Sequence, residues 1–257
     1  MSHYIDLNSD LGESFGNYTL GMDSEVLNHV TSANVACGWH AGDPLIMEAT
    51  VRMCKEKGVA VGAHPGYPDL MGFGRRAMAV NPSEAKAYMT YQLGALQAFC
   101  DSYGVTLQHM KLHGAFYNTA CVTPALADAV LDGLQAVNSN IAAMVLSGSY
   151  IAKEAQRRGI PVIQEVFADR GYTDEGTLVP RTEPGAFIKD PQEALERVLM
   201  MVKEGKVVTN TGNTIDIVAD SICVHGDNPE AIAFTKYIRE GLAKAGVTVA
   251  NFQDRKK

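Results

Sequence analysis

The chain has 257 residues, a length that accommodates one large α/β domain or two small ones, either with a substantial buried core. Hydrophobic residues make up 46% and charged residues 20%, and no run of about 18 apolar residues is present that would span a bilayer. The formal net charge of -7 argues against a nucleic-acid partner, which would require Lys and Arg massed on one face.

The first residues and the cysteines indicate the compartment. The N-terminal sequence MSHYIDLNSD lacks the basic start and the apolar run of a signal peptide. The five cysteines are an odd number at wide spacings without a CxxC pair, which favours reduced thiols over a disulfide framework or a thiolate zinc site. We therefore expect a soluble cytoplasmic protein.

Glycine and proline mark alternating helices and strands along the chain. Four glycines end helical patterns and precede β-branched or apolar runs: Gly58, Gly104, Gly159 and Gly246. Five prolines follow a residue suited to capping a helix: Asp43-Pro44, Asn81-Pro82, Thr123-Pro124, Asp190-Pro191 and Asn228-Pro229. The repeated unit is a helix, a glycine that ends it, and a strand.

Seven core strands are predicted between these marks, near residues 4–9, 31–36, 59–63, 107–112, 142–147, 161–166 and 221–225. Alternating strands and helices predict a parallel sheet. No dinucleotide fingerprint follows the first strand, so we expect one closed or nearly closed (β/α) barrel over residues 1–257 rather than an open doubly wound sheet. Residues 206–218 predict a hairpin before the last core strand.

Polar residues share one face of two predicted strands. Asp6, Asn8 and Asp10 alternate with apolar residues along the first strand, so all three point to the same side. Lys111 and His113 do the same near the carboxyl end of the fourth strand. We therefore expect a polar stripe inside the barrel.

Further ionisable residues follow the predicted strands at their carboxyl ends: His40, His64, Glu165, Arg170 and His225. In a (β/α) barrel that end carries the active site, because the loops after the strands and the amino termini of the helices converge there. The pattern predicts one active site built from residues far apart in the sequence.

The segment ACGWHAGDP, residues 36–44, is predicted to be one of these loops. Its glycines allow a tight turn, and Asp43 is better suited to cap the next helix than to act as a catalyst. We expect His40 to face the mouth of the barrel and Trp39 to form a wall of the site.

Structural roles compete with these functional ones. A lone histidine is more often a core or surface residue than a ligand, and we assign His3, His29 and His109 to that class. Asp6 fits equally well as a structural residue that accepts hydrogen bonds from loop amides.

The segment GFGRRA, residues 72–77, resembles G-x-G-x-x-A but follows no predicted strand, which argues against a dinucleotide site. Arg75 and Arg76 are better suited to contact an anion or a partner. The chain contains neither a P-loop motif nor the G-x-S-x-G motif of serine hydrolases.

Six long motifs occur in order from residue 6 to residue 229: DLNSDLGESFG, TSANVACGWHAGDP, VGAHPGYPDLMGFGRR, KLHGAFYN, EVFADRGYTDEGTLVPR and ICVHGDNP. Together they resemble the LamB/YcsF family over nearly the whole chain. Trp39, Leu112 and Phe116 depart from the usual family pattern, which leaves the size of the pocket open.

The resemblance implies a seven-stranded (β/α) barrel of the glycoside hydrolase/deacetylase type. It also implies the role of the A subunit in an ATP-dependent 5-oxoprolinase, which hydrolyses 5-oxoproline (pyroglutamate) to L-glutamate while ATP is cleaved to ADP and phosphate. The expected partners are subunits B and C of that enzyme.

A five-membered lactam is a poor electrophile, so coupling its opening to ATP makes chemical sense. We expect Asp10 or Glu165 as general base, with Lys111 and His113 stabilising the developing charge. The residues expected to bind substrate or phosphate are Asp6, Asn8, Asn34, His40, His64, Arg170 and His225.

Two other functions remain open from the sequence. Asp and His residues at strand ends also suit a divalent metal, as in a metal-dependent deacetylase or amidohydrolase. Alternatively, the barrel only binds a small acid and delivers it to partner subunits. The sequence does not decide whether a metal is bound or which subunit of the complex binds ATP.

Overall fold

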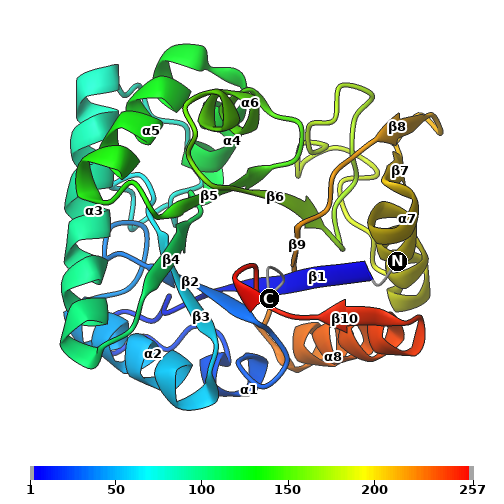
Figure 1. Cartoon of the computed structure of the whole chain (residues 1–257), viewed down its shortest axis with the longest axis horizontal. Coiled ribbons are helices and arrows are strands. Elements are labelled where there is room, and N and C mark those ends of the chain that lie inside the picture. Colours follow the sequence, from blue (N-terminus) through cyan, green and yellow to red (C-terminus); the bar gives the residue numbers. More distant parts are fainter. Residues whose placement is uncertain (1–2, 255–257) are drawn as a thin grey trace.

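A closed barrel of parallel strands forms the centre of the computed structural model, which describes residues 3–254 (Figure 1). Its strands are β1 (His3–Leu11), β2 (Ser32–Ala36), β3 (Ala60–His64), β4 (Leu107–Met110), β5 (Ala142–Leu146), β6 (Val162–Phe167) and β9 (Ser221–Cys223). Each strand pairs with the next in this order, and β9 pairs with β1 to close the ring. The predicted seven-stranded (β/α) barrel is confirmed.

Helices surround the barrel on its outer face (Figure 1). They are α1 (Asp23–Val26), α2 (Pro44–Lys57), α3 (Pro82–Tyr103), α4 (Gly114–Val122), α5 (Pro124–Val137), α6 (Tyr150–Arg157), α7 (Pro191–Glu204) and α8 (Pro229–Lys244). Within residues 3–254 no single helix is long and apolar enough to cross a membrane. Only α4 and α5, taken together, are both long and apolar enough, and the chain bends by 115° between them.

The predicted helix boundaries are confirmed, with one difference in capping. All five prolines occupy the first turn of a helix, and the side chains before four of them accept hydrogen bonds from backbone N–H groups of that turn. Thr123 makes no such bond; it also ends α4, where its own N–H donates to the carbonyl of Thr119. At the other helix ends, Gly58 and Gly104 adopt the left-handed conformation at φ 67° and 61°.

Three short strands lie outside the barrel. The predicted hairpin is present as β7 (Lys206–Val208) and β8 (Thr214–Asp216), paired antiparallel. β10 (Val247–Val249), which was not among the predicted core strands, pairs with residues 3–5 of β1. Because β9 pairs with β1 only over residues 6–8, β10 covers the stretch of β1 that would otherwise be an open edge.

Hydrogen-bonded polar residues fill the barrel interior near the amino-terminal end of its strands. Asp6 is fully buried and accepts hydrogen bonds from the hydroxyls of Thr31 at 2.6 Å, Ser32 at 2.7 Å and Ser221. These three partners are hydroxyls: Ser32 lies in β2, Ser221 in β9, and Thr31 directly before β2. Asp6 therefore ties β1 to β2 and β9 at the amino-terminal end of the strands.

His109 lies in the barrel interior next to Gly62. Its Nε2 is 2.7 Å from Oδ1 of Asn34 and its Nδ1 is 3.2 Å from Oε1 of Gln108. Burial, together with the nearby charge of Lys111, lowers the pKa of His109 to about 3, so the ring is neutral. As expected from the sequence, this histidine belongs to the core.

We predict that Gly62→Ala destabilises the barrel, because the added Cβ would lie 2.1 Å from Nε2 of the hydrogen-bonded His109. Overpacking of this kind should lower the free energy of unfolding by at least about 2 kcal/mol, as measured by urea denaturation. The matched control is Gly94→Ala on the exposed side of α3, where no atom lies within 4 Å of the new Cβ. Equal midpoints for the two variants would contradict the prediction.

Candidate active site

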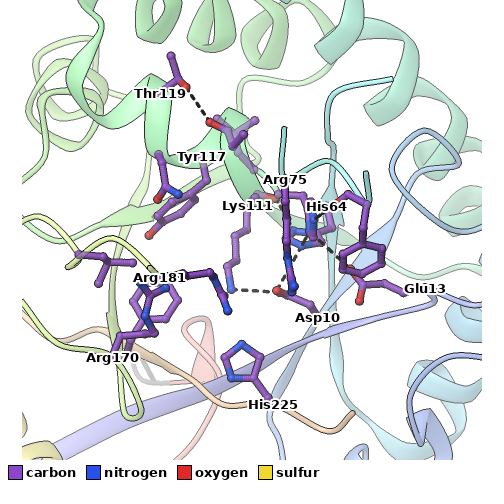
Figure 2. A pocket seen from close by; sticks show the side chains of 18 of the residues that line it. Asp10, Glu13, His64, Arg75, Lys111, Tyr117, Thr119, Arg170, Arg181 and His225 are labelled. Atoms are coloured by element: carbon purple, nitrogen blue, oxygen red, sulfur yellow. Dashed lines mark hydrogen bonds and ion pairs between the residues drawn. The ribbon is translucent and has the colours of Figure 1, made fainter. Parts of the chain in front are cut away.

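A pocket of about 600 Å³ opens at the carboxyl ends of the barrel strands (Figure 2). The loops after five strands contribute side chains to it. The predicted site residues that line it are Asp10, His64, Lys111, His113, Arg170 and His225. The remaining predicted residues, which do not line it, are Asp6, Asn8, Asn34, His40 and Glu165. Residues from distant parts of the chain therefore meet in one cavity.

The ammonium group of Lys111 lies at the floor of this pocket. Its Nζ is 3.0 Å from Oδ1 of Asp10 and 2.7 Å from Oε1 of Glu165, and only 3% of the side chain is exposed. Burial lowers the pKa of a lysine, but here Asp10, Cys223 and Glu165 outweigh that effect and hold the pKa of Lys111 well above its usual range. Lys111 is therefore a fixed positive charge and not a proton acceptor.

Asp10 faces the pocket beside Lys111. Its Oδ1 also accepts a hydrogen bond from Nδ2 of Asn34 at 2.8 Å, and its Oδ2 is 3.3 Å from Nε2 of His64. Burial raises the pKa of Asp10, but His64 and then Lys111 outweigh it and hold the pKa well below its usual range. Asp10 is ionised at neutral pH and oriented by its neighbours.

Glu165 lies behind Lys111 and has no exposed surface. Its Oε2 accepts a hydrogen bond from the hydroxyl of Tyr117 at 2.7 Å. This position suits an anchor for Lys111 and Tyr117. The role of general base predicted for Glu165 stays a prediction, and its lack of access to the pocket makes Asp10 the better candidate.

Asn8 and Asn34 form the layer directly below the pocket. Oδ1 of Asn8 accepts hydrogen bonds from Nδ2 of Asn34 at 2.8 Å and from Nζ of Lys111 at 3.1 Å. These amides hold Lys111 and Asp10 from below, and Asp6 lies one layer further down. The substrate contacts predicted for Asp6, Asn8 and Asn34 stay untested, and the three side chains lack direct access to the pocket.

Three histidines and Glu13 form a cluster on one side of the pocket. The rings of His40 and His113 stack in parallel with centroids 3.7 Å apart, and Nδ1 of His113 is 2.9 Å from Nε2 of His64. Burial, and then His64, lowers the pKa of His113 to about 3. Burial, and then His113 and His64, likewise holds the pKa of His40 well below its usual range. Both rings are neutral at physiological pH.

Glu13 is a pocket residue that the sequence analysis missed. Its Oε1 is 3.1 Å from Nε2 of His40 and 3.5 Å from Nδ1 of His113. Burial, and then the charges of Asp10 and Asp227, raises the pKa of Glu13 well above its usual range. The residue belongs to the motif DLGESFG, but the alternation along the first strand ends before it. Only the turn after β1 brings it back over the barrel.

Two arginines of the pocket, Arg170 and Arg181, lie on the opposite side of Lys111 from Glu13 and His64 (Figure 2). Arg170 is held by the segment that follows β6, because its Nε donates to the carbonyl of Ala186 at 3.0 Å and its guanidinium lies 5.1 Å from the ring centroid of Phe187. Arg181 lies 5.3 Å from the centroid of the same ring. The sequence analysis did not single out Arg181.

The two arginines of the GFGRRA segment differ in position. Arg75 lines the pocket, 5.0 Å from the ring centroid of Phe73, and is available to an anion there. Arg76 instead pairs with Asp69 and does not reach the pocket. The contact with an anion that was expected of this pair is therefore available to Arg75 alone.

The expectation that Trp39 forms a wall of the site is wrong. Its indole packs against α3, with ring centroids 4.7 Å from Tyr88 and 5.4 Å from Tyr91, and it does not line the pocket. The turn places Trp39 on the outside and His40 on the inside. His40 therefore contacts Glu13 from beneath instead of facing the mouth. Of the three departures from the family pattern, only Leu112 lines the pocket.

His225 and Asp169 form an ion pair at the pocket. Nδ1 of His225 is 3.0 Å from Oδ2 of Asp169, and both side chains are about one-quarter exposed, at 26% and 24%. Burial lowers the pKa of His225, but the charge and hydrogen bond of Asp169 outweigh it and raise the pKa above its usual value. His225 therefore carries positive charge over more of the neutral range than a free histidine.

The chain is similar to known proteins over nearly its whole length. Residues 5–257 match the LamB/YcsF family. The chain is 60% identical to the A subunit of 5-oxoprolinase from Fusobacterium nucleatum over 254 residues, 99% of each chain, and 54% identical to the corresponding subunit from Pyrococcus abyssi over 97% and 98% of the two chains.

Solved structures share the fold. The lactam utilization protein from Thermus thermophilus superposes with a TM-score of 0.92 at 44% identity, over 97% of this chain and 100% of that one. A CE4 family pseudoenzyme superposes with a TM-score of 0.50 at 11% identity, over 98% of this chain and 67% of that one. The second similarity shows a shared type of barrel and nothing about the site.

We predict that Asp169→Asn lowers the pKa of His225, measured by NMR titration of the imidazole. The raised pKa means that the ion pair contributes stability below the unfolded value of about 6.5, and that this contribution is lost as the pH rises through the folded pKa. The stability difference between wild type and variant should therefore shrink as the pH rises. Asp174→Asn, whose carboxylate accepts from Thr209, Thr211 and Asn213, is the matched control. An unchanged His225 titration in Asp169→Asn would refute the assignment.

Proposed function

The chain belongs to the LamB/YcsF family, and we propose that it acts as the A subunit of an ATP-dependent 5-oxoprolinase that hydrolyses 5-oxoproline to L-glutamate. The observation that carries a hydrolytic role is the Lys111 ammonium, held at the pocket floor between Asp10 and Glu165. The relatives named as 5-oxoprolinase subunits and the solved lactam utilization protein narrow the substrate to this lactam.

The charges around the pocket suit an anionic substrate. 5-Oxoproline carries a carboxylate beside its lactam ring, and its phosphorylated form carries further negative charge. Arg75, Arg170 and Arg181 offer guanidinium groups that bind carboxylate or phosphate oxygens in pairs. His225 adds positive charge when protonated. These groups can hold the acid while the lactam carbonyl reaches Lys111.

The lactam carbonyl is a poor electrophile and must be activated before water can attack it. Transfer of the γ-phosphoryl group of ATP to the lactam oxygen activates the ring carbon. Water then adds to that carbon with Asp10 as general base, the electron pair of the C=N bond moves to the ring nitrogen, and Lys111 stabilises the negative charge of the phosphorylated oxygen. The ring C–N bond breaks as the nitrogen takes up a proton, which leaves an acyl phosphate. Its hydrolysis by a second water releases phosphate and L-glutamate.

Subunits B and C complete the proposed enzyme. The chain carries no P-loop of its own, and the reaction requires ATP bound somewhere in an assembly with subunits B and C. A cytoplasmic location fits the five free, buried cysteines.

A metal-dependent deacetylase would instead act on an N-acetyl substrate without ATP, and a pure binding subunit would tolerate changes at the pocket floor.

We predict that Asp10→Asn and Lys111→Ala each lower ATP-coupled glutamate formation by at least about 100-fold, because they remove the general base and the charge that faces the reacting oxygen. The assay measures glutamate released by the chain reconstituted with subunits B and C. Since Lys111→Ala leaves two carboxylates without their cation, circular dichroism and thermal melting must show that each variant is folded.

The matched control is Asp101→Asn, on the exposed end of α3 away from the pocket, which should retain wild-type turnover. Near-normal turnover in both folded pocket variants would refute the proposal in favour of a binding subunit. Turnover of an N-acetyl substrate without ATP would favour the deacetylase.

A further inference from the structure

The hydrogen bonds of His64 and His113 define which ring nitrogens carry protons. Nδ1 of His64 lies 2.8 Å from the backbone carbonyl of Lys111, and Nε2 of His113 lies 2.7 Å from the carbonyl of Phe73. A carbonyl oxygen only accepts hydrogen bonds, so both of these nitrogens must be the protonated ones. The remaining nitrogen of each ring is the one that a metal ion could bind.

Those two remaining nitrogens face each other. Nε2 of His64 and Nδ1 of His113 are 2.9 Å apart. Oε1 of Glu13 lies 3.5 Å from the same Nδ1. Three atoms of the types that bind metals thus lie within 4.8 Å of one another, and Oδ2 of Asp10 lies 3.3 Å from Nε2 of His64 beside them.

The separations suit a transition metal. Zinc bonds to nitrogen at about 2.0–2.1 Å, which places neighbouring ligands of a tetrahedral site about 3.3 Å apart. The distances of 2.9 Å and 3.5 Å at Nδ1 of His113 lie on either side of that value. Neutral imidazole and carboxylate are also ligand types that zinc accepts.

From this geometry we infer that Glu13, His64 and His113 bind a divalent transition-metal cation, with zinc the ion that suits them best, and leave its fourth position open to the pocket. All three side chains line the pocket. When bound, such a cation supplies a Lewis acid beside Asp10 and Lys111. The inference concerns metal binding only and does not depend on the identity of the substrate.

His40 supports this site, but it cannot bind the same metal ion as His113. A metal lies close to the plane of the imidazole that binds it, and the parallel rings of His40 and His113 share no such point. Nδ1 of His40 is buried without a partner among residues 3–254, which favours the tautomer whose Nε2–H donates to Glu13. His40 is therefore a positioning residue that orients the carboxylate.

The surrounding backbone has the features of a built site. Histidines that bind metals typically donate their other N–H to a carbonyl or carboxylate, as His64 and His113 do. Phe73, which supplies one of these carbonyls, is the only non-glycine residue with positive φ, at 52°, among residues 3–254. A left-handed conformation at such a residue is strained, and strain of this kind concentrates at functional sites.

The test uses the full chain stripped with a chelator and titrated with Co²⁺, whose visible absorption reports tetrahedral coordination, followed by competition with Zn²⁺. We expect one equivalent per chain. His40→Gln should weaken binding by about 10–100-fold, as loss of an outer hydrogen bond does, and Glu13→Gln, His64→Gln and His113→Gln by at least about 100-fold. His225→Gln, a histidine of the same pocket outside the cluster, should bind as the wild type.

A second measurement guards against variants that fail to fold. In the ¹⁵N NMR spectrum of the wild type, Zn²⁺ should shift Nε2 of His64 and Nδ1 of His113 and leave both nitrogens of His225 in place. Absence of saturable binding by the stripped wild type, or wild-type affinity in the folded Glu13, His64 and His113 variants, would overturn the metal site. Either result leaves the 5-oxoprolinase proposal standing, since that rests on ATP-coupled glutamate formation.

Discussion

The ammonium of Lys111, buried between Asp10 and Glu165, is the interaction on which the site depends. Taking a charge out of water costs several kcal/mol unless partners surround it. Here the partners come from the first, sixth and last strands of the barrel, through Asp10, Glu165 and Cys223. Closing the ring brings them to one point, so the same geometry that completes the fold also neutralises the charge. Removing the carboxylate of Asp10 or of Glu165 would therefore disturb both the fold and the charge balance at Lys111.

Two kinds of side chain line the pocket on opposite sides of Lys111. Arg170 and Arg181 come from the segment after β6 and present positive charge suited to a carboxylate or phosphate. On the other side, His64, His113 and Glu13 present nitrogen and oxygen atoms that suit a cation. A small anionic lactam lying between them would have its charged end fixed by guanidinium groups and its amide within reach of Lys111 and Asp10. This division explains how one small cavity can hold an anion and act on its amide.

Local signals in the sequence were enough for the architecture and for much of the site. Asp43, Asn81, Asp190 and Asn228 cap helices as their position before proline predicts, and strand ends marked by His64, Lys111 and His225 converge on the pocket. Sequence patterns did not predict the direction of a side chain where a turn decides it. Trp39 and His40 are adjacent, yet one packs on α3 and the other lies beneath Glu13. Glu13 itself was overlooked because strand alternation does not extend into the loop.

The sequence by itself determined the seven-stranded barrel, its helix boundaries and the family, because alternating polarity, capping residues and long ordered motifs act over short stretches of chain. Only the tertiary structure decided which carboxylate faces the pocket. Asp10 and Glu165 both follow from the pattern as candidate bases, and depth in the barrel separates them. How deep a side chain lies below the pocket depends on the stagger of neighbouring strands and on the side chains that pack around it. These are properties of the closed barrel and not of any one segment.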